Sequence, residues 1–259
     1  MFYVLSIIVS FTHHCIIPLV YSPMPATNSS TATWVGAIAA FAAGSLVTAA
    51  YLKNNRRSKK EISFPATDGN KSSSSSIDYP TYDYENDPKG SFTSICDLLI
   101  EEIINELPQT YELPSRETEW LRKMLDYTVK GGKMNRGLMV VESGVAMKLE
   151  RGDKVTNTDL CQLAVLGWSI EWLQAWLLVA DDIMDSSVTR RGQQCWYKTL
   201  GDAWYIAIND AVTIEAFVYK IIKRHFGYNS CLQLQLLDLM METTLQTELG
   251  QLSDTLCDV

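Results

Sequence analysis

From about Phe92 onward, apolar residues recur every three or four positions, which is the spacing of one helical face. The first such stripe contains Ile95, Leu98, Leu99, Ile103 and Leu107. We expect further helices over residues 119–130, 135–149, 202–226 and 230–252, and a long one that Asn157 or Thr158 caps and that ends in an aspartate cluster. No segment has the clean alternation of a strand, so the pattern predicts an all-α fold.

Two apolar segments precede this helical region. Residues 1–22 are similar to the apolar part of a signal peptide, without its usual basic start. Residues 33–52 carry no charge and are long enough to span a bilayer, and a basic segment follows at residues 53–60. By the positive-inside rule we expect a membrane anchor with the downstream domain facing the cytosol. The alternatives are a cleaved targeting peptide or a spurious upstream extension, which leave the domain cytoplasmic or mitochondrial.

The stretch between the apolar segments and the helices is polar. Residues 53–90 contain a run of serines and several prolines, and we expect a disordered linker there. Tyr79, Tyr82 and Tyr84 lie among acidic residues near its end, which is also typical of a docking motif. The helical domain is therefore expected to cover residues 91–259.

Composition narrows the classes of function. With 47% apolar residues in 259, the chain can bury a large core, and its net charge of −8 argues against binding to nucleic acid. Its six cysteines form no CxxC pair and no metal-ligand spacing. We therefore expect small, buried, reduced thiols and a reducing compartment.

The long apolar helix ends in three aspartates. Asp181 and Asp185 lie one turn apart on one face, and Asp182 points about 100° away from Asp181. Two carboxylates on one face suit a Mg²⁺ that keeps waters and takes its remaining ligands from substrate phosphates. Arg190 and Arg191 follow and offer forked donors for a polyphosphate. The alternative is a solvated acidic helix end, although the apolar residues upstream make buried acids costly there.

A second cluster, GGKMNRG, covers residues 131–137. Its glycines allow a tight turn and close approach of the backbone to an anion, and Lys133 and Arg136 add positive charge. It is not a Walker A loop, because no Ser or Thr follows the lysine. A simple glycine turn before a helix is the alternative interpretation.

Together with these clusters, the segments LVADDIMDSSVTRRGQQCWY and QTELGQ resemble the short-chain isoprenyl diphosphate synthase family, most of all the animal farnesyl diphosphate synthases. The resemblance runs from about Phe92 to Asp254. It implies an isoprenoid synthase helical bundle with a central cavity and, at full length, a homodimer. It also implies a Mg²⁺-dependent prenyltransferase of isoprenoid biosynthesis, which joins an allylic diphosphate to isopentenyl diphosphate and yields farnesyl or geranyl diphosphate.

The resemblance implies roles for particular residues. Asp181, Asp182 and Asp185 would form the metal site of the allylic diphosphate, and Arg190 would face that diphosphate. Isopentenyl diphosphate would be held by Lys133, Arg136, Gln174 and Arg191. Further positions match the allylic site, its metal and the region that sets product length: Gln251, Asp254, Trp176 and Leu177.

One departure from the family bears on activity. Family members carry a second aspartate-rich motif well downstream, and the sequence as far as Val259 does not include it. We therefore expect a C-terminally truncated bundle that does not turn over. Two alternatives are a non-catalytic binding or regulatory subunit and a terpene synthase of the same fold. The intact Lys133, Arg136 and Arg191 favour coupling over cyclisation.

Overall fold

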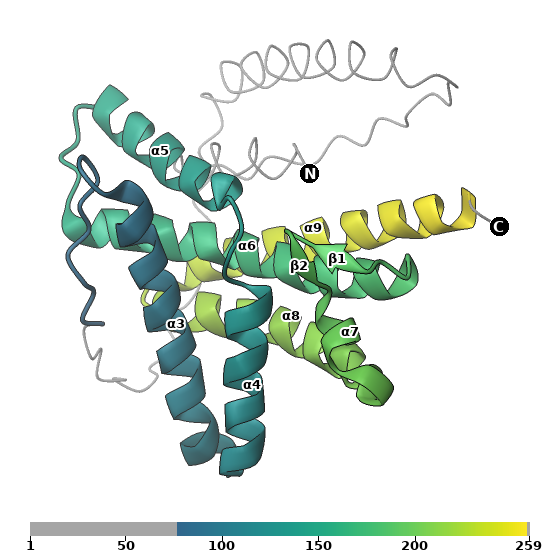
Figure 1. Ribbon diagram of the computed structural model, residues 1–259. Coiled ribbons are helices and arrows are strands. Elements are labelled where there is room, and N and C mark those ends of the chain that lie inside the picture. The colour runs from purple at the N-terminus through teal and green to yellow at the C-terminus, as the bar shows by residue number, and fades with distance from the viewer. Residues whose placement is uncertain (1–76, 258–259) are drawn as a thin grey trace, which may run out of the picture. The chain divides into compact units, whose positions relative to one another are not determined.

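The computed structural model describes residues 77–257, which form a helical bundle with one small hairpin (Figure 1). The elements are α3 (Pro88–Tyr111), α4 (Ser115–Thr128), α5 (Asn135–Glu150), α6 (Asn157–Met184), β1 (Thr189–Arg190), β2 (Gln193–Gln194), α7 (Trp196–Thr199), the 3₁₀ turn η2 (Gly201–Ala203), α8 (Ile206–His225) and α9 (Ser230–Cys257). The prediction of an all-α fold is confirmed, with the two-residue strands as the exception. The apolar segments 1–22 and 33–52 lie outside the described residues.

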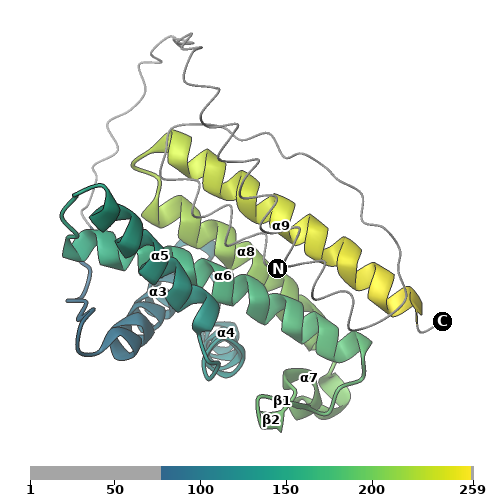
Figure 2. The same cartoon turned by 90° about the horizontal axis from the view of Figure 1, so that it is seen from above.

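Helix α6 is the centre of the bundle. Its neighbours include α5, α8, α3 and α9, and in the view from above it lies between α5 and α9 (Figure 2). A helix that several others cover has to be apolar on nearly every side, and α6 is. Its Trp168 and Trp172 are fully buried. Among residues 77–257 it is the one helix long and apolar enough to cross a membrane, but most of its apolar stretch is packed inside the protein.

The cap of α6 differs from the prediction. Thr156, rather than Asn157 or Thr158, is the N-cap, and it forms a reciprocal capping box with Asp159. The Asn157 side chain instead accepts a hydrogen bond from the Tyr82 backbone N–H at 2.7 Å and donates to the Pro80 carbonyl. The Asn157 side-chain amide therefore forms a tertiary contact and does not cap α6.

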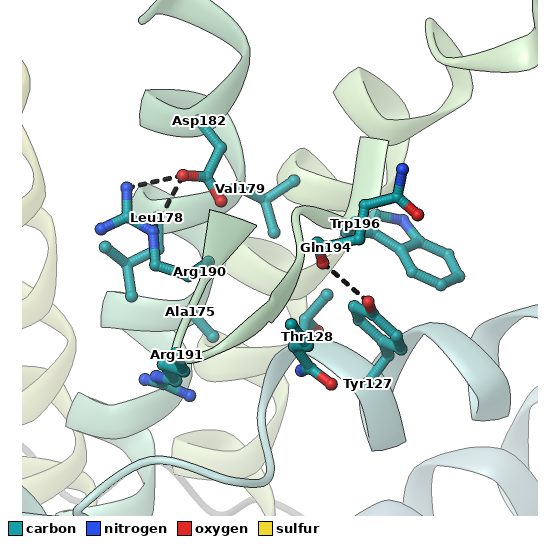
Figure 3. Close-up of a pocket in the computed structure, with 11 residues that line it drawn as sticks. Tyr127, Thr128, Ala175, Leu178, Val179, Asp182, Arg190, Arg191, Gln194 and Trp196 are labelled. Carbon is teal, nitrogen blue, oxygen red and sulfur yellow. Dashed lines mark hydrogen bonds and ion pairs between the residues drawn. The ribbon is translucent and has the colours of Figure 1, made fainter. Parts of the chain in front are cut away.

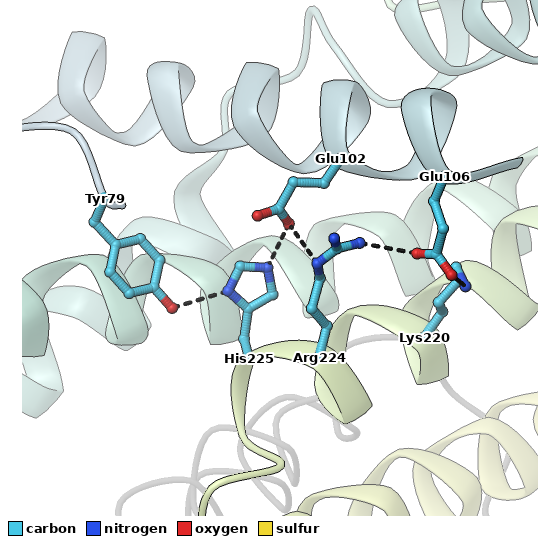
Figure 4. Close-up of polar contacts among 6 residues, drawn as sticks. All are labelled: Tyr79, Glu102, Glu106, Lys220, Arg224 and His225. Carbon is cyan, nitrogen blue, oxygen red and sulfur yellow. Dashed lines mark hydrogen bonds and ion pairs between the residues drawn. The ribbon is translucent and has the colours of Figure 1, made fainter. Parts of the chain in front are cut away.

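The expected linker is wrong over its last residues. Tyr82 is buried in the core, and the Tyr79 hydroxyl forms a hydrogen bond of 2.8 Å with Nδ1 of His225. The Nε2 atom of His225 lies 2.8 Å from a Glu102 oxygen. Helix α3, helix α8 and the segment just before α3 therefore meet at one buried imidazole (Figure 4). Helix α3 then begins at Pro88, capped by Asp87, instead of near residue 91. The acidic composition of this segment suggested a linker, but its tyrosine rings pack against the core of the bundle.

Two glycines allow α5 and α6 to cross closely. A methyl group on Gly167 would lie 2.5 Å from the backbone oxygen of Gly137, and one on Gly137 would meet the Gly167 oxygen and the ring of Phe92. At the same crossing, the Gly137 N–H donates to the buried Glu171 carboxylate at 2.9 Å. The start of α5 is thereby fixed on the middle of α6.

A buried carboxylate joins α4, α7 and α8. Asp210 accepts hydrogen bonds from the indole N–H groups of Trp120, at 2.9 Å, and Trp196, at 2.8 Å. Burial raises the pKa of the Asp210 carboxyl, and the two indole donors partly oppose that rise. The helix predicted over residues 202–226 starts later than expected. The 3₁₀ turn η2, in which Gly201 has a φ of 58°, precedes it, and α8 begins only at Ile206.

Two other predicted helices differ from the observed ones by a few residues at their ends. The helix expected over 119–130 covers Ser115–Thr128, and the last one extends to Cys257. Cys96, Cys161 and Cys195 are buried free thiols, as expected, whereas Cys231 and Cys257 are exposed. Helix α9 also exposes a row of large apolar side chains: Leu234, Met241, Leu245, Leu249, Leu252 and Leu256.

Candidate functional site

The three aspartates at the end of α6 lie in different environments. The Asp182 side chain is 5% exposed and the Asp181 side chain 27% exposed, whereas Asp185 is the exposed C-cap of the helix. Arg190 bridges the first two: Nε and Nη2 donate to Asp182 Oδ1 at 2.8 and 2.6 Å, and Nη2 donates to Asp181 Oδ2 at 2.9 Å. Figure 3 shows the Arg190–Asp182 pair beside the hairpin.

The hairpin β1–β2 folds back on the end of α6 and carries both arginines. Its backbone uses the left-handed region at Ser186 and Arg191, with φ of 54° at each. Tyr127 of α4 donates to the Gln194 carbonyl at 2.7 Å, and Tyr197 donates to the Ser187 carbonyl at 2.9 Å. These contacts hold the hairpin from both sides, so Arg190 faces the aspartates while the neighbouring Arg191 lies near the glycine turn.

Asp182 has a second buried neighbour in Cys195. Burial, together with a hydrogen bond to Asp182, raises the pKa of the Cys195 thiol to about 11. The thiol therefore stays protonated at neutral pH. Asp182, which the resemblance to the family includes in the metal site, is thus buried and held by the hairpin. Its role as a metal ligand stays a prediction.

The glycine turn forms a seat for Arg191. A methyl group on Gly132 would lie 2.9 Å from Cζ of Arg191, so this guanidinium rests directly against the turn. Gly131 has a φ of 87°, and Arg191 also reaches the Lys130 carbonyl at 3.5 Å. The turn that precedes α5 and the hairpin that follows α6 are therefore neighbours, although about 60 residues separate them in the sequence.

The other predicted cationic residues lie around the start of α5. Arg136 donates to the Gln174 side-chain oxygen at 3.0 Å, which brings two of the predicted isopentenyl diphosphate ligands together. Lys133 is exposed on the same turn. Glu171, which fixes the Gly137 backbone, is a positioning residue that sequence reasoning missed. Its position three residues before Gln174, on an otherwise apolar helix, was the available signal.

The C-terminal part of helix α9 contacts the aspartate cluster at the end of α6. Gln251 donates through Nε2 to Asp181 Oδ1 at 3.0 Å, so the structure brings these two predicted residues together. Asp254 is exposed, three residues further along α9. Trp176 is buried and Leu177 half-buried in the core one turn before the aspartates. Their predicted effect on product length is not tested by these positions.

The space behind the hairpin is too small for a substrate. Asp182, Arg190, Arg191 and Trp196 are among the residues that line a cavity of about 30 Å³, whereas pockets for small ligands measure roughly 300–1,000 Å³. Asp181 and Asp185 do not line this cavity, and both reach solvent outside it. Exposed carboxylates there are hard oxygen ligands of the kind that Mg²⁺ prefers, and the described residues hold no cage of three or more His, Cys, Asp or Glu side chains.

Comparison with known proteins decides the family. Residues 118–258 match the model of the polyprenyl synthetase family. The chain belongs to the polyprenyl synthetase family. This match covers α4 to α9, which includes the glycine turn, the aspartates and the hairpin.

The polyprenyl synthetase relatives are longer than this chain. A farnesyl pyrophosphate synthase of Candida albicans is 45% identical over 159 residues, which are 60% of this chain and 45% of the relative. One of Saccharomyces cerevisiae is 43% identical over 163 residues, 63% of this chain and 46% of the relative. A T. brucei farnesyl diphosphate synthase complexed with minodronate has a TM-score of 0.60 and 34% identity, over 64% of this chain and 47% of that one. The chain thus spans about half the length of the relatives it matches.

Proposed function

We propose that this chain carries the first half of a prenyltransferase site, which binds an allylic diphosphate with Mg²⁺ and couples it to isopentenyl diphosphate. The observation that supports this proposal most is that α6, α9, the hairpin and the glycine turn meet. Arg190 and Gln251 both donate hydrogen bonds to Asp181, and Arg191 lies against Gly132. The farnesyl diphosphate synthases among the relatives support farnesyl diphosphate as product. A T. brucei synthase described with a bisphosphonate supports recognition of paired phosphate-like groups.

Each cluster has a distinct task in this proposal. Asp181 and Asp185 would hold Mg²⁺, which supplies positive charge to the departing diphosphate. Arg190 binds the same diphosphate through its forked donors. Lys133, Arg136 and Arg191 bind the second diphosphate, and the Arg136–Gln174 hydrogen bond fixes the orientation of one of these cations. The intact cations support coupling rather than cyclisation, and a requirement for isopentenyl diphosphate distinguishes the two.

The first prediction concerns metal-dependent binding. In calorimetric titrations of the chain with geranyl diphosphate, we expect binding with Mg²⁺ and a loss of at least about tenfold in affinity with EDTA. The double variant Asp181→Ala/Asp185→Ala should show the same loss in the presence of Mg²⁺. The matched control is Asp153→Ala/Asp238→Ala, which removes two exposed carboxylates elsewhere. Equal affinities with Mg²⁺ and with EDTA would refute the proposal.

The second prediction concerns the seat of Arg191. Gly132→Ala places a methyl group against a flexible guanidinium, so it should change stability little but displace Arg191. We expect affinity for isopentenyl diphosphate to fall about tenfold, the value of one charged hydrogen bond. The check is a double-mutant cycle by calorimetry: Gly132→Ala should add nothing to Arg191→Gln. Full additivity of the two losses would show that the turn does not act through Arg191.

Compartment and assembly belong to the same proposal. A relative from Arabidopsis thaliana, 40% identical over 170 residues, is described as mitochondrial. Together with the buried free thiols, this supports a reducing compartment, either the cytoplasm or the mitochondrion. The membrane anchor at residues 33–52 and the homodimer stay predictions.

A further inference from the structure

Both carboxylate oxygens of Asp181 already accept hydrogen bonds. Oδ2 accepts from Nη2 of Arg190 at 2.9 Å, and Oδ1 accepts from Nε2 of Gln251 at 3.0 Å. A divalent cation that binds Asp181 directly has to use the remaining lone pair of one of these oxygens, next to the donor that already occupies the other. It would also approach the fixed positive charge of Arg190, which repels it.

The hold on Arg190 is unequal between the two aspartates. Asp182 receives two of the three hydrogen bonds, including the one from Nε, and its side chain is nearly buried. Asp181 receives a single bond from the terminal Nη2 and is more exposed. The guanidinium is planar and moves as one unit. Pivoting it about the contact between Nε and Asp182 withdraws Nη2 from Asp181, together with the Nη2 bond to Asp182, while Asp182 keeps hold of Nε.

A diphosphate is the kind of anion that can draw this nitrogen away. It carries more negative charge than one carboxylate, and its oxygens match the forked donors of a guanidinium. Once Nη2 has moved to a phosphate oxygen, both lone pairs of Asp181 Oδ2 are available to a metal. The same turn moves the positive charge onto the anion and away from the carboxylate.

We propose that Arg190 is an internal counter-ion of Asp181, which a diphosphate has to draw away before a divalent cation binds that carboxylate tightly. Asp182 is then a positioning residue that serves as the pivot of Arg190. Metal binding and anion binding are thereby coupled through one side chain. The inference rests on the proposed function, because it requires that Asp181 binds the metal that accompanies a diphosphate.

The test uses Mn²⁺ as the probe and electron paramagnetic resonance to count free ions, on the chain of 259 residues. Without any anion, we expect Arg190→Gln to bind Mn²⁺ about tenfold more tightly than the unaltered chain, because a nearby positive charge is gone. Arg190→Lys keeps the charge and should stay close to the unaltered chain. The matched control is Arg116→Gln, which removes the charge of an exposed arginine at the start of α4 and should leave Mn²⁺ affinity unchanged.

Adding inorganic pyrophosphate completes the test. It should raise the Mn²⁺ affinity of the unaltered chain and of Arg116→Gln, but much less that of Arg190→Gln. An Arg190→Gln variant that binds Mn²⁺ no better than the unaltered chain, while the latter gains from pyrophosphate, would overturn the inference and leave the proposed function intact. No gain from pyrophosphate in any of the chains would count against the proposed function itself.

A measurement on the unaltered chain guards against misfolding of the variant. The Nη2–H signal of Arg190, observed by ¹⁵N nuclear magnetic resonance, reports the hydrogen bond to Asp181 directly. We expect it to move when Mg²⁺ and pyrophosphate are added together, and to stay in place with the same concentration of Mg²⁺ alone. A full shift with Mg²⁺ alone would show that the metal displaces Arg190 unaided, which contradicts the inference.

Discussion

Gly167→Ala is expected to lower the free energy of unfolding by about 1–3 kcal/mol or more, as overpacking of a tight core does. The new methyl group would lie 2.5 Å from the backbone oxygen of Gly137. A flexible side chain could move aside, but here the neighbour is the backbone of a packed helix. Helix α5 must therefore shift away from α6, which strains the hydrogen bond from the Gly137 N–H to Glu171.

Urea unfolding followed by circular dichroism checks the Gly167→Ala prediction. The matched control is Gly250→Ala on α9, where a methyl group meets nothing within 4 Å. In an open helical position alanine is favoured over glycine by up to about 1 kcal/mol, so the control should be neutral or stabilising. Equal stabilities of Gly167→Ala and the unaltered chain would mean that α5 and α6 do not cross as closely as described.

Asp210→Ala should have a comparable or larger effect. It leaves the indole N–H groups of Trp120 and Trp196 without an acceptor, and each unsatisfied buried donor costs about 1–3 kcal/mol. A cavity where α4, α7 and α8 meet adds to that cost. We expect a lower unfolding midpoint together with a shift of the tryptophan fluorescence to longer wavelength. Unchanged fluorescence and stability would show that the two indoles do not depend on this carboxylate.

Asp210→Asn gives the conservative control and a pH dependence of known sign. The amide keeps one acceptor, so it should cost less than alanine. Because burial raises the pKa of Asp210 in the folded state, the folded chain holds this proton more tightly than the unfolded chain. The stability that Asp210 contributes is therefore complete below its ordinary pKa and declines as the pH rises through the folded pKa. The advantage of the unaltered chain over Asp210→Asn should accordingly be greatest at low pH.

Much of the architecture could be predicted from the sequence, because helices depend on the local spacing of apolar residues. The apolar period of a helix survives in α3, α5 and α9, and it predicted their positions to within a few residues. The aspartates, the paired arginines and the glycine turn were found because each is a short run of chemically unusual residues in an apolar context. Their joint resemblance to one family is confirmed by the match over residues 118–258.

Only the tertiary structure decided which of these groups meet. Asp181 and Asp182 are neighbours in the sequence, yet one faces α9 and the other is buried against the hairpin. The acceptor of the Trp120 indole is 90 residues away, and the partner of Tyr79 is 146 residues away. No local period encodes such contacts, because they depend on how whole helices are packed and on which polar atoms burial leaves in need of a partner. The sequence determined the helices and the chemistry that they carry, and packing determined which carboxylate reaches solvent and which one is buried and holds an arginine in place.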